Sequence, residues 1–241
     1  MSGNTHKTQT ALPLSTIHHT PTPTVADQVF DELQKHILTL ELPPSTKISE
    51  TEVANKMGVS RQPVREAFKR LAKLGFLEIR PQSGTKISLI SEESVLRARF
   101  IRIALEVHTC QAACDRLTPD GIKQLRDLIE LQRAAVSAND RVTFHKLDDE
   151  FHQKICVLAD VGYVWDLIRD SKAHMDRIRM LSLNETSQRF ALEEHIEIVD
   201  AIAAQDTEIV AQVVKKHLSR ILTLIEEIKA TNHSWFTDGQ P

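Results

Sequence analysis

The segment Gly58-Val59-Ser60-Arg61-Gln62-Pro63-Val64-Arg65-Glu66-Ala67 has the pattern of a tight turn that leads into a helix. Gly58 suits a left-handed turn, Ser60 suits an N-cap, and Pro63 falls in the first helical turn, where its missing N–H costs little. The helix opens with three polar or cationic side chains, those of Arg61, Gln62 and Arg65. Arg pairs with guanine, Gln pairs with adenine, and both bind phosphate, so this exposed helix start suits a groove of DNA.

The flanking sequence supplies the other parts of a winged helix-turn-helix. Residues 25–40 read as an amphipathic helix, and Ser49 with Glu52 forms a capping box at the start of the next helix. Residues 76–79 and 85–89 are the expected strands of a small β-hairpin wing. The alternative is a solvated basic helix in an ordinary α+β domain.

This stretch closely resembles the winged-helix domain of the GntR family of bacterial transcription regulators. The match rests on Leu40-Glu41-Leu42-Pro43-Pro44, on residues 58–67 and on the wing-tip glycine, Gly84. The resemblance implies that DNA is contacted by Thr51, Ser60, Arg61, Gln62, Arg65, Ser83 and Gly84. Three residues depart from the family's usual pattern: Ser45 stands where Gly is usual, Thr51 where many members have a DNA-contacting Arg, and Gln62 where Thr is common. These departures affect the expected operator sequence and leave the expected activity unchanged.

Composition bounds the class of protein. The 241 residues have room for one large or two modest domains. No run approaches the ~18 apolar residues that a membrane helix needs, and the N-terminus lacks a secretion signal, so we expect a cytoplasmic protein. The cysteines Cys110, Cys114 and Cys156 lack zinc-finger spacing and read as reduced thiols. Ten Lys or Arg against eight Asp or Glu give residues 23–90 a charge of +2, whereas nineteen against twenty-five give residues 91–241 a charge of −6.

The sequence divides into four segments. Residues 1–22 are rich in Thr, Ser, Pro and His and are expected to form a disordered tail. The winged domain covers residues 23–90, a helical domain covers 91–230, and a second tail covers 231–241. Helical periodicity in the third segment predicts helices over about 92–115, 119–137, 141–159, 162–183, 187–204 and 207–230. We therefore expect a mainly α protein in which the winged helix-turn-helix precedes an antiparallel all-α bundle.

Four residues of the expected bundle have the chemistry of metal ligands. Asp148 and His152 lie one turn apart on one helix face, while His195 and His217 lie among apolar residues of two later helices. Three imidazoles and one carboxylate suit Zn²⁺ or another divalent first-row ion. The alternative is that Asp148 and His152 form an ordinary intrahelical pair and that the other two histidines are hydrogen-bonded or surface residues.

The helical segment also resembles the ligand-sensing FCD domain of the FadR branch of GntR regulators. Metal-binding members carry Asp-x3-His on one helix and single histidines on two later helices. The segments Leu147-Asp148-Asp149-Glu150-Phe151-His152, Glu194-His195-Ile196-Glu197-Ile198-Val199 and His217-Leu218 match that pattern. The resemblance implies a divalent metal ion held by Asp148, His152, His195 and His217, with Zn²⁺ favoured over Ni²⁺ and Mn²⁺.

An anionic effector needs cations besides a metal. Arg102 shares a helical stripe with apolar residues and suits bidentate carboxylate binding, although a salt bridge to Glu106 is an equal alternative. The resemblance suggests pocket roles for His174 and Arg179, for which an exposed helix face is the alternative.

These observations favour a ligand-responsive transcription regulator rather than an enzyme. We expect a homodimer that reads an inverted-repeat operator in double-stranded DNA and is released by a small carboxylate effector. The alternatives are a metalloenzyme with an accessory nucleic-acid module and a ligand-free architectural protein. The chain lacks His-Glu-x-x-His and any Gly-rich phosphate loop, which argues against the enzyme.

Overall fold

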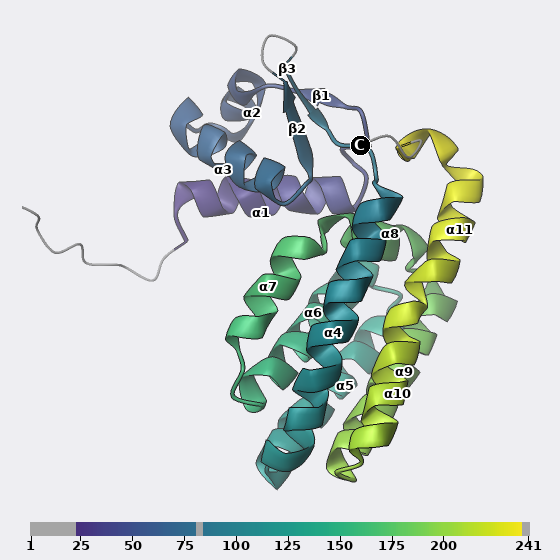
Figure 1. Cartoon of the computed structure of the whole chain (residues 1–241). Helices are drawn as coiled ribbons and strands as arrows, with labels where there is room; N and C mark the ends of the chain where they lie inside the picture. The colour runs from purple at the N-terminus through teal and green to yellow at the C-terminus, as the bar shows by residue number, and fades with distance from the viewer. Residues whose placement is uncertain (1–22, 81–83, 238–241) are drawn as a thin grey trace, which may run out of the picture.

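The computed structural model describes residues 23–80 and 84–237, and it places a winged part at one end of a helical bundle (Figure 1). This arrangement confirms the predicted fold class. The predicted tail over residues 1–22 and the predicted DNA contact of Ser83 lie outside the described residues.

The winged part combines three helices with a small antiparallel sheet. Its elements are α1 (Val25–Leu38), β1 (Lys47–Ile48), α2 (Glu50–Met57), α3 (Arg61–Lys73), β2 (Leu77–Arg80) and β3 (Gly84–Ile87). The strand order is β1-β3-β2, so β3 is central and pairs with both neighbours. Strand β1 was not predicted because two residues are too few to produce a detectable alternation of polar and apolar side chains.

The turn between α2 and α3 forms as the sequence predicts. Gly58 has φ 66°, the left-handed conformation that ends α2. Ser49 accepts a hydrogen bond from the Glu52 amide at 3.1 Å, but the reciprocal bond of the predicted capping box, from the Ser49 amide to the Glu52 side chain, is absent among the described residues. Ser60 stands at the N-cap of α3, but its side chain makes no capping hydrogen bond, which corrects the role predicted for it. The apolar stripe of α3 is buried against α1 and α2.

The departure from the family pattern at Ser45 has a structural cost. Ser45 has φ 69°, a region that glycine enters more readily than serine. Its amide donates to the Ile87 carbonyl at 2.9 Å, which ties the loop before β1 to β3. The loop therefore requires the left-handed conformation even though the chain has serine there.

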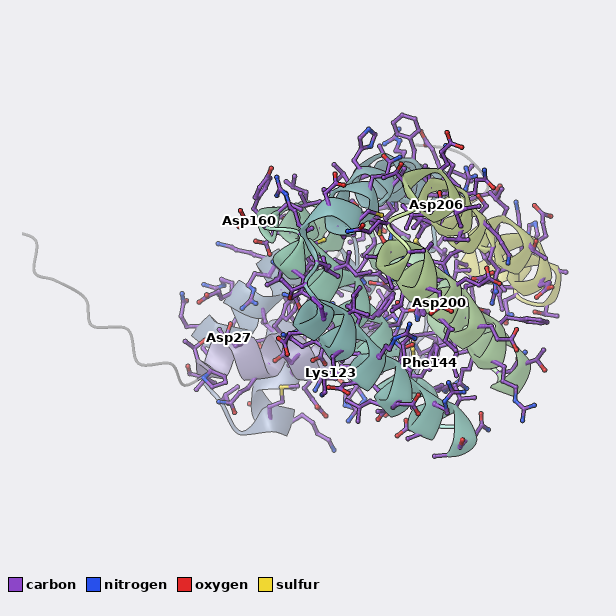
Figure 2. All side chains as sticks on the ribbon, turned by 90° about the horizontal axis from the view of Figure 1, so that it is seen from below. Asp27, Lys123, Phe144, Asp160, Asp200 and Asp206 are labelled. Carbon is purple, nitrogen blue, oxygen red and sulfur yellow. The ribbon has the colours of Figure 1, made fainter. Side chains whose placement is uncertain are left out.

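Eight helices of the described residues form the bundle. They are α4 (Glu92–Arg116), α5 (Pro119–Ser137), α6 (Arg141–Leu158), α7 (Tyr163–Ser171), α8 (Ala173–Ser182), α9 (Glu185–Ala203), α10 (Thr207–Ser219) and α11 (Ile221–Thr231). Thr118, Asp140 and Asp206 cap α5, α6 and α10 through their side chains, as predicted. Seen from below, the turns that carry Asp160 and Asp206 lie at the end of the bundle, and Phe144 on α6 is fully buried in its core (Figure 2).

Two of the predicted helices are divided. The helix expected over 162–183 breaks at Lys172, whose buried ammonium contacts Asp149 and Asp176. The helix expected over 207–230 breaks at Arg220, whose amide bonds the His217 carbonyl three residues back. Neither break is marked by glycine or proline, so periodicity did not reveal it.

The predicted tail from residue 231 differs from the structure. Residues His233–Trp235 form a short 3-10 helix, and Phe236 pairs with Ile90 in an isolated parallel bridge. Phe236 is buried, because its apolar ring packs in a cluster with Ile90 and Val95 at the start of α4. The chain thus returns from α11 to the junction between the winged part and the bundle.

Helix α8 joins the two parts of the molecule. Ala173 packs into the core of the winged part. The Nδ1 atom of His174 accepts a hydrogen bond from the Ser91 amide at 3.2 Å, and Arg177 donates to the Ser88 carbonyl at 2.8 Å. One face of α8 is therefore hydrogen-bonded to the segment that leads from β3 into α4.

Gly75 provides a test of this junction. Its φ is 87°, and a Cβ atom there would lie 2.9 Å from Nε2 of His174, whereas a Cβ at Gly58 would meet nothing within 4 Å. Gly58→Ala should cost about 1–2 kcal/mol of unfolding free energy through its left-handed backbone alone. Gly75→Ala should cost about 1–3 kcal/mol more, because it also displaces His174. Urea unfolding of both variants measures the difference, and equal losses would contradict the close packing at His174.

Candidate functional site

Six of the expected DNA-contacting residues are described, and they lie on the outer surface of the winged part. Arg61 and Arg65 at the start of α3 have side chains that are 60% and 47% exposed. Gln62, Ser60, Thr51 and Gly84 are exposed as well. Helix α2 and the N-terminal end of α3 lie away from the bundle, which leaves this surface open to a large partner (Figure 1).

The four expected metal ligands converge within the bundle. Asp148 and His152 come from α6, His195 from α9 and His217 from α10, and one possible ligand atom from each lies within 4.8 Å of those of the others. Nε2 of His195 is 3.4 Å from Asp148 Oδ1, and Nε2 of His152 is 3.9 Å from Asp148 Oδ2. Asp148 and His195 are fully buried, and His152 is nearly so. Residues up to 69 positions apart in sequence, from Asp148 to His217, therefore form one cluster.

Each of the three imidazoles is oriented by an acceptor on its other nitrogen. Nδ1 of His152 is 2.7 Å from Glu106 Oε2, Nδ1 of His217 is 2.8 Å from Glu194 Oε2, and Nδ1 of His195 is 2.8 Å from Gln132 Oε1. These oxygens only accept hydrogen bonds, so each Nδ1 carries a proton and the Nε2 atom of each ring is left for another partner. Metal-binding histidines in proteins have this same arrangement.

The electrostatics of the cluster also favour ligand chemistry. Burial lowers the pKa of His195 well below its ordinary value and also lowers that of His217, so both rings are neutral at pH 7. Burial alone would raise the pKa of Asp148, but Arg179 and the neighbouring imidazoles outweigh it and lower that pKa. Nε2 of His152 and of His195 has no hydrogen-bond partner among the described residues. Such buried, unpaired lone pairs are costly unless an ion or a proton donor completes them.

A second cluster of possible ligands does not have this character. His145, Asp149 and Asp176 lie close together, but the Lys172 ammonium sits 2.8 Å from Asp149 and 2.6 Å from Asp176. A cation of the chain itself is therefore already paired with both carboxylates.

A narrow cavity of about 50 Å³ adjoins the first cluster. Helices α4, α6, α8, α9, α10 and α11 contribute its lining, which consists of Arg102, Phe144, Met175, Arg179, Ser182, Leu183, Ser187, Ala191, Glu194, His217, Leu218, Arg220, Ile221 and Leu224. It therefore joins one of the four possible ligands to three guanidinium groups.

The structure separates the three expected effector residues. Arg102 lines the cavity and also forms the alternative salt bridge, with its Nε 2.5 Å from Glu106 Oε1. Arg179 lines the cavity and contacts Asp148. His174 does not line it, which corrects the pocket role suggested for this residue. His174 and Arg177 face the winged part, while Arg179 lies on the side of α8 that faces α6.

Several residues of the site were not predicted. The hydrogen-bond acceptors Glu106, Gln132 and Glu194 orient the imidazoles, and Arg220 contacts Glu194 and donates to the Ser187 carbonyl at 3.3 Å. Arg220 follows His217 by three residues, so helical spacing could have placed the two on one face. Gln132 had no such signal, because only the tertiary fold brings α5 to His195.

The three cysteines are buried free thiols, and none belongs to a cluster of possible ligands among the described residues. Burial raises the pKa of Cys156 to about 12 and also raises the pKa of Cys110, so neither thiol ionises near neutral pH.

Among the described residues, no helix is both long and apolar enough to cross a membrane.

Comparisons with known proteins agree with these features. A family model described as "Bacterial regulatory proteins, gntR family" matches residues 25–87, and an FCD domain model matches residues 98–220. The Uncharacterized HTH-type transcriptional regulator YdfH of Escherichia coli O6:H1 is 36% identical over 90% of this chain and 96% of its own length. The HTH-type transcriptional repressor RspR of Escherichia coli K12 is 35% identical over the same shares. The solved structure of Escherichia coli McbR/YncC has a TM-score of 0.73 at 21% identity, covers 85% of this chain and 98% of its own, and shows the same fold.

The buried position of His174 predicts an acid-sensitive junction. Burial lowers the pKa of His174 from 6.5 to about 4, so the unfolded chain takes up the proton before the folded chain does. Stability should be unaffected by this group above about pH 6.5 and should fall by at most about 3 kcal/mol as the pH drops toward 4. The variant His174→Asn should lose stability less steeply over this range, as measured by urea unfolding at several pH values. The exposed His108→Asn should keep the wild-type slope; an unchanged slope in His174→Asn would contradict the prediction.

Proposed function

This chain belongs to the GntR family of bacterial transcription regulators, and from that premise we propose that it represses transcription until a small carboxylate binds beside a metal ion in its bundle. Its relatives are regulators and not enzymes, so the metalloenzyme alternative is set aside. The observation that carries the proposal is the convergence of Asp148, His152, His195 and His217, whose rings are held by acceptors at Nδ1. A bacterial regulator of this kind acts in the cytoplasm, where the chromosome lies.

The residues present fit a divalent metal ion. Three Nε2 atoms and one carboxylate match the preference of Zn²⁺ for nitrogen and oxygen ligands, with Ni²⁺ or Mn²⁺ as alternatives. Asp148 supplies one negative charge, and the unpartnered nitrogens of His152 and His195 supply lone pairs in a buried setting. When bound, such an ion supplies positive charge and open coordination positions that a carboxylate can take.

The adjoining cavity favours an anion. Arg102, Arg179 and Arg220 line it, and each is paired with an acid: Glu106, Asp148 and Glu194 respectively. These six groups sum to zero charge, so a divalent ion would leave the site at +2. A small mono- or dicarboxylate fits this charge, and guanidinium groups bind carboxylates in bidentate geometry.

Helix α8 offers a route from the cavity to the winged part. Arg179 near its C-terminal end contacts Asp148, while Ala173, His174 and Arg177 contact the winged part and the β3–α4 segment. An effector that competes for Arg179 would favour a different placement of α8. Operator affinity then changes only by the difference in effector affinity between the two placements.

A homodimer completes the proposal, because two winged parts related by two-fold symmetry suit an inverted repeat. The candidate dimer surface lies along α4 and α7, which pack side by side (Figure 1). Leu96 and Phe100 on α4 and Tyr163 and Leu167 on α7 are exposed apolar or aromatic side chains, and Phe100 is 74% exposed. Exposed apolar side chains on two adjacent helices would suit an interface between two copies of the chain.

Metal and effector can be tested together. Native mass spectrometry of protein purified without chelator should show a bound divalent ion, and His195→Ala should lose it. Fluorescence anisotropy with a labelled duplex from the region upstream of the gene should measure operator binding. Small carboxylic acids should weaken this binding by the wild type by roughly 5- to 150-fold, the usual range of allosteric coupling. The same acids should have little effect on His195→Ala.

The exposed His108→Ala is the matched control and should keep both the ion and the response. Equal responses to the acids in wild type and His195→Ala would refute the role of the metal. Operator binding without any response to acids would refute the proposed effector class and leave DNA binding intact.

The dimer surface can be tested by placing a charge on it. Phe100→Lys should shift the native mass from dimer to monomer at micromolar concentration and weaken binding to a two-half-site operator, because a buried unpaired ammonium is strongly unfavourable at an interface. Leu131→Lys changes an exposed apolar residue on α5 in the same way and should remain dimeric. A dimeric Phe100→Lys would show that the interface lies elsewhere.

A further inference from the structure

The cations expected to meet DNA are already paired with acids of the chain. Arg65 donates to Glu50 from Nε at 3.2 Å and from Nη2 at 3.1 Å, and Nη2 of Arg61 lies 3.5 Å from the same carboxylate. Glu50 is the first residue of α2, whereas both arginines stand in the first turns of α3. One carboxylate therefore spans the helix-turn-helix and holds two guanidinium groups.

The wing repeats this arrangement on another element. Lys86 on β3 places Nζ 2.9 Å from Glu78 Oε2, and Arg80 on β2 contacts the other oxygen of the same side chain. Glu78 and Lys86 are register partners of the antiparallel pair. Glu78 therefore holds two cations of the wing, as Glu50 does at the recognition helix.

Both carboxylates remain charged at neutral pH. The pKa of Glu50 is lowered chiefly by the hydrogen bond from Arg65, and that of Glu78 chiefly by the hydrogen bond from Lys86. The first-residue position of Glu50 also suits the positive end of the α2 dipole. Pairs exposed to water are weak and exchangeable, so DNA can separate them at small cost.

The winged part has a small net positive charge, so the two acids Glu50 and Glu78 offset a large share of its cations. Residues 23–90 carry only +2, and Glu50 and Glu78 face four of the ten cations. Sequence-independent binding depends almost entirely on cations that meet phosphates, whereas operator binding adds contacts with base edges. A carboxylate beside these cations weakens every phosphate contact, whereas only the operator offers base edges whose contacts offset the separation of the pairs.

We propose that Glu50 and Glu78 are specificity-determining residues, which hold four cations of the DNA-binding surface and suppress binding to non-operator DNA. Their substitution by glutamine keeps the side-chain length and removes the charge. Released cations would then meet phosphates of any duplex, and the ratio of operator affinity to non-operator affinity would fall.

The test uses the full chain and two duplexes of equal length. One is the operator selected in vitro by the wild type from random duplexes, and the other is its shuffled sequence. Fluorescence anisotropy over a range of salt concentrations gives the affinity and its salt dependence for each. For Glu50→Gln and for Glu78→Gln, affinity for the shuffled duplex should rise roughly threefold to tenfold, and the log–log salt slope should steepen by about 0.9 for each phosphate gained.

Affinity for the operator should rise less than affinity for the shuffled duplex, so the specificity ratio should fall in each variant and fall further in the double variant. Glu66→Gln is the matched control. It removes an exposed carboxylate from α3 that has no ion-pair partner among the described residues, and it should change both affinities by a similar, smaller factor.

An unchanged or increased specificity ratio in both variants would overturn the proposal, as would an equal fall in Glu66→Gln. Lower operator affinity with unchanged affinity for the shuffled duplex would also overturn it, because the acids would then serve only to order α3. Thermal unfolding of each variant identifies any loss of fold. Glu78→Gln lies on the wing and tests the idea independently of α2.

Discussion

A fully buried carboxylate must be matched by positive charge, and Asp148 sets this requirement at the centre of the bundle. Arg179 reaches it from α8, and the rings of His152, His195 and His217 surround it from α6, α9 and α10. This ion pair ties α8 to α6, and α8 in turn contacts the segment between β3 and α4. The electrostatic balance around one side chain is thereby linked to the placement of the winged part.

Acidic side chains act differently in the bundle and on the winged part. In the bundle, Glu106 and Glu194 are buried and use their charge to orient imidazoles and guanidinium groups. On the winged part, Glu50 and Glu78 make similar pairs in contact with water, where each pair contributes little to stability. The buried pairs therefore fix geometry, whereas the exposed pairs can exchange partners when DNA arrives.

Much of this architecture could be predicted from local signals. Gly58, the caps at Thr118 and Asp140 and the spacing of Asp148 and His152 each act within a few residues, so sequence alone indicated them. The break at Lys172, the break at Arg220 and the two-residue strand β1 arise from tertiary contacts without a local marker. His174 shows the same limit: its helix was predicted, but the face it presents depends on the break two residues earlier.

The return of the chain to Ile90 has a practical consequence. Ile90 donates to the Trp235 carbonyl at 2.8 Å and accepts from the Thr237 amide at 3.0 Å. The last described residues therefore hold the segment that connects the winged part to the bundle. Deleting residues from 232 onward would expose the apolar side chains that Phe236 covers and would loosen the connection between the winged part and the bundle. The helix-turn-helix and the histidine cluster would keep all their residues. A purification handle is therefore better fused at the opposite terminus.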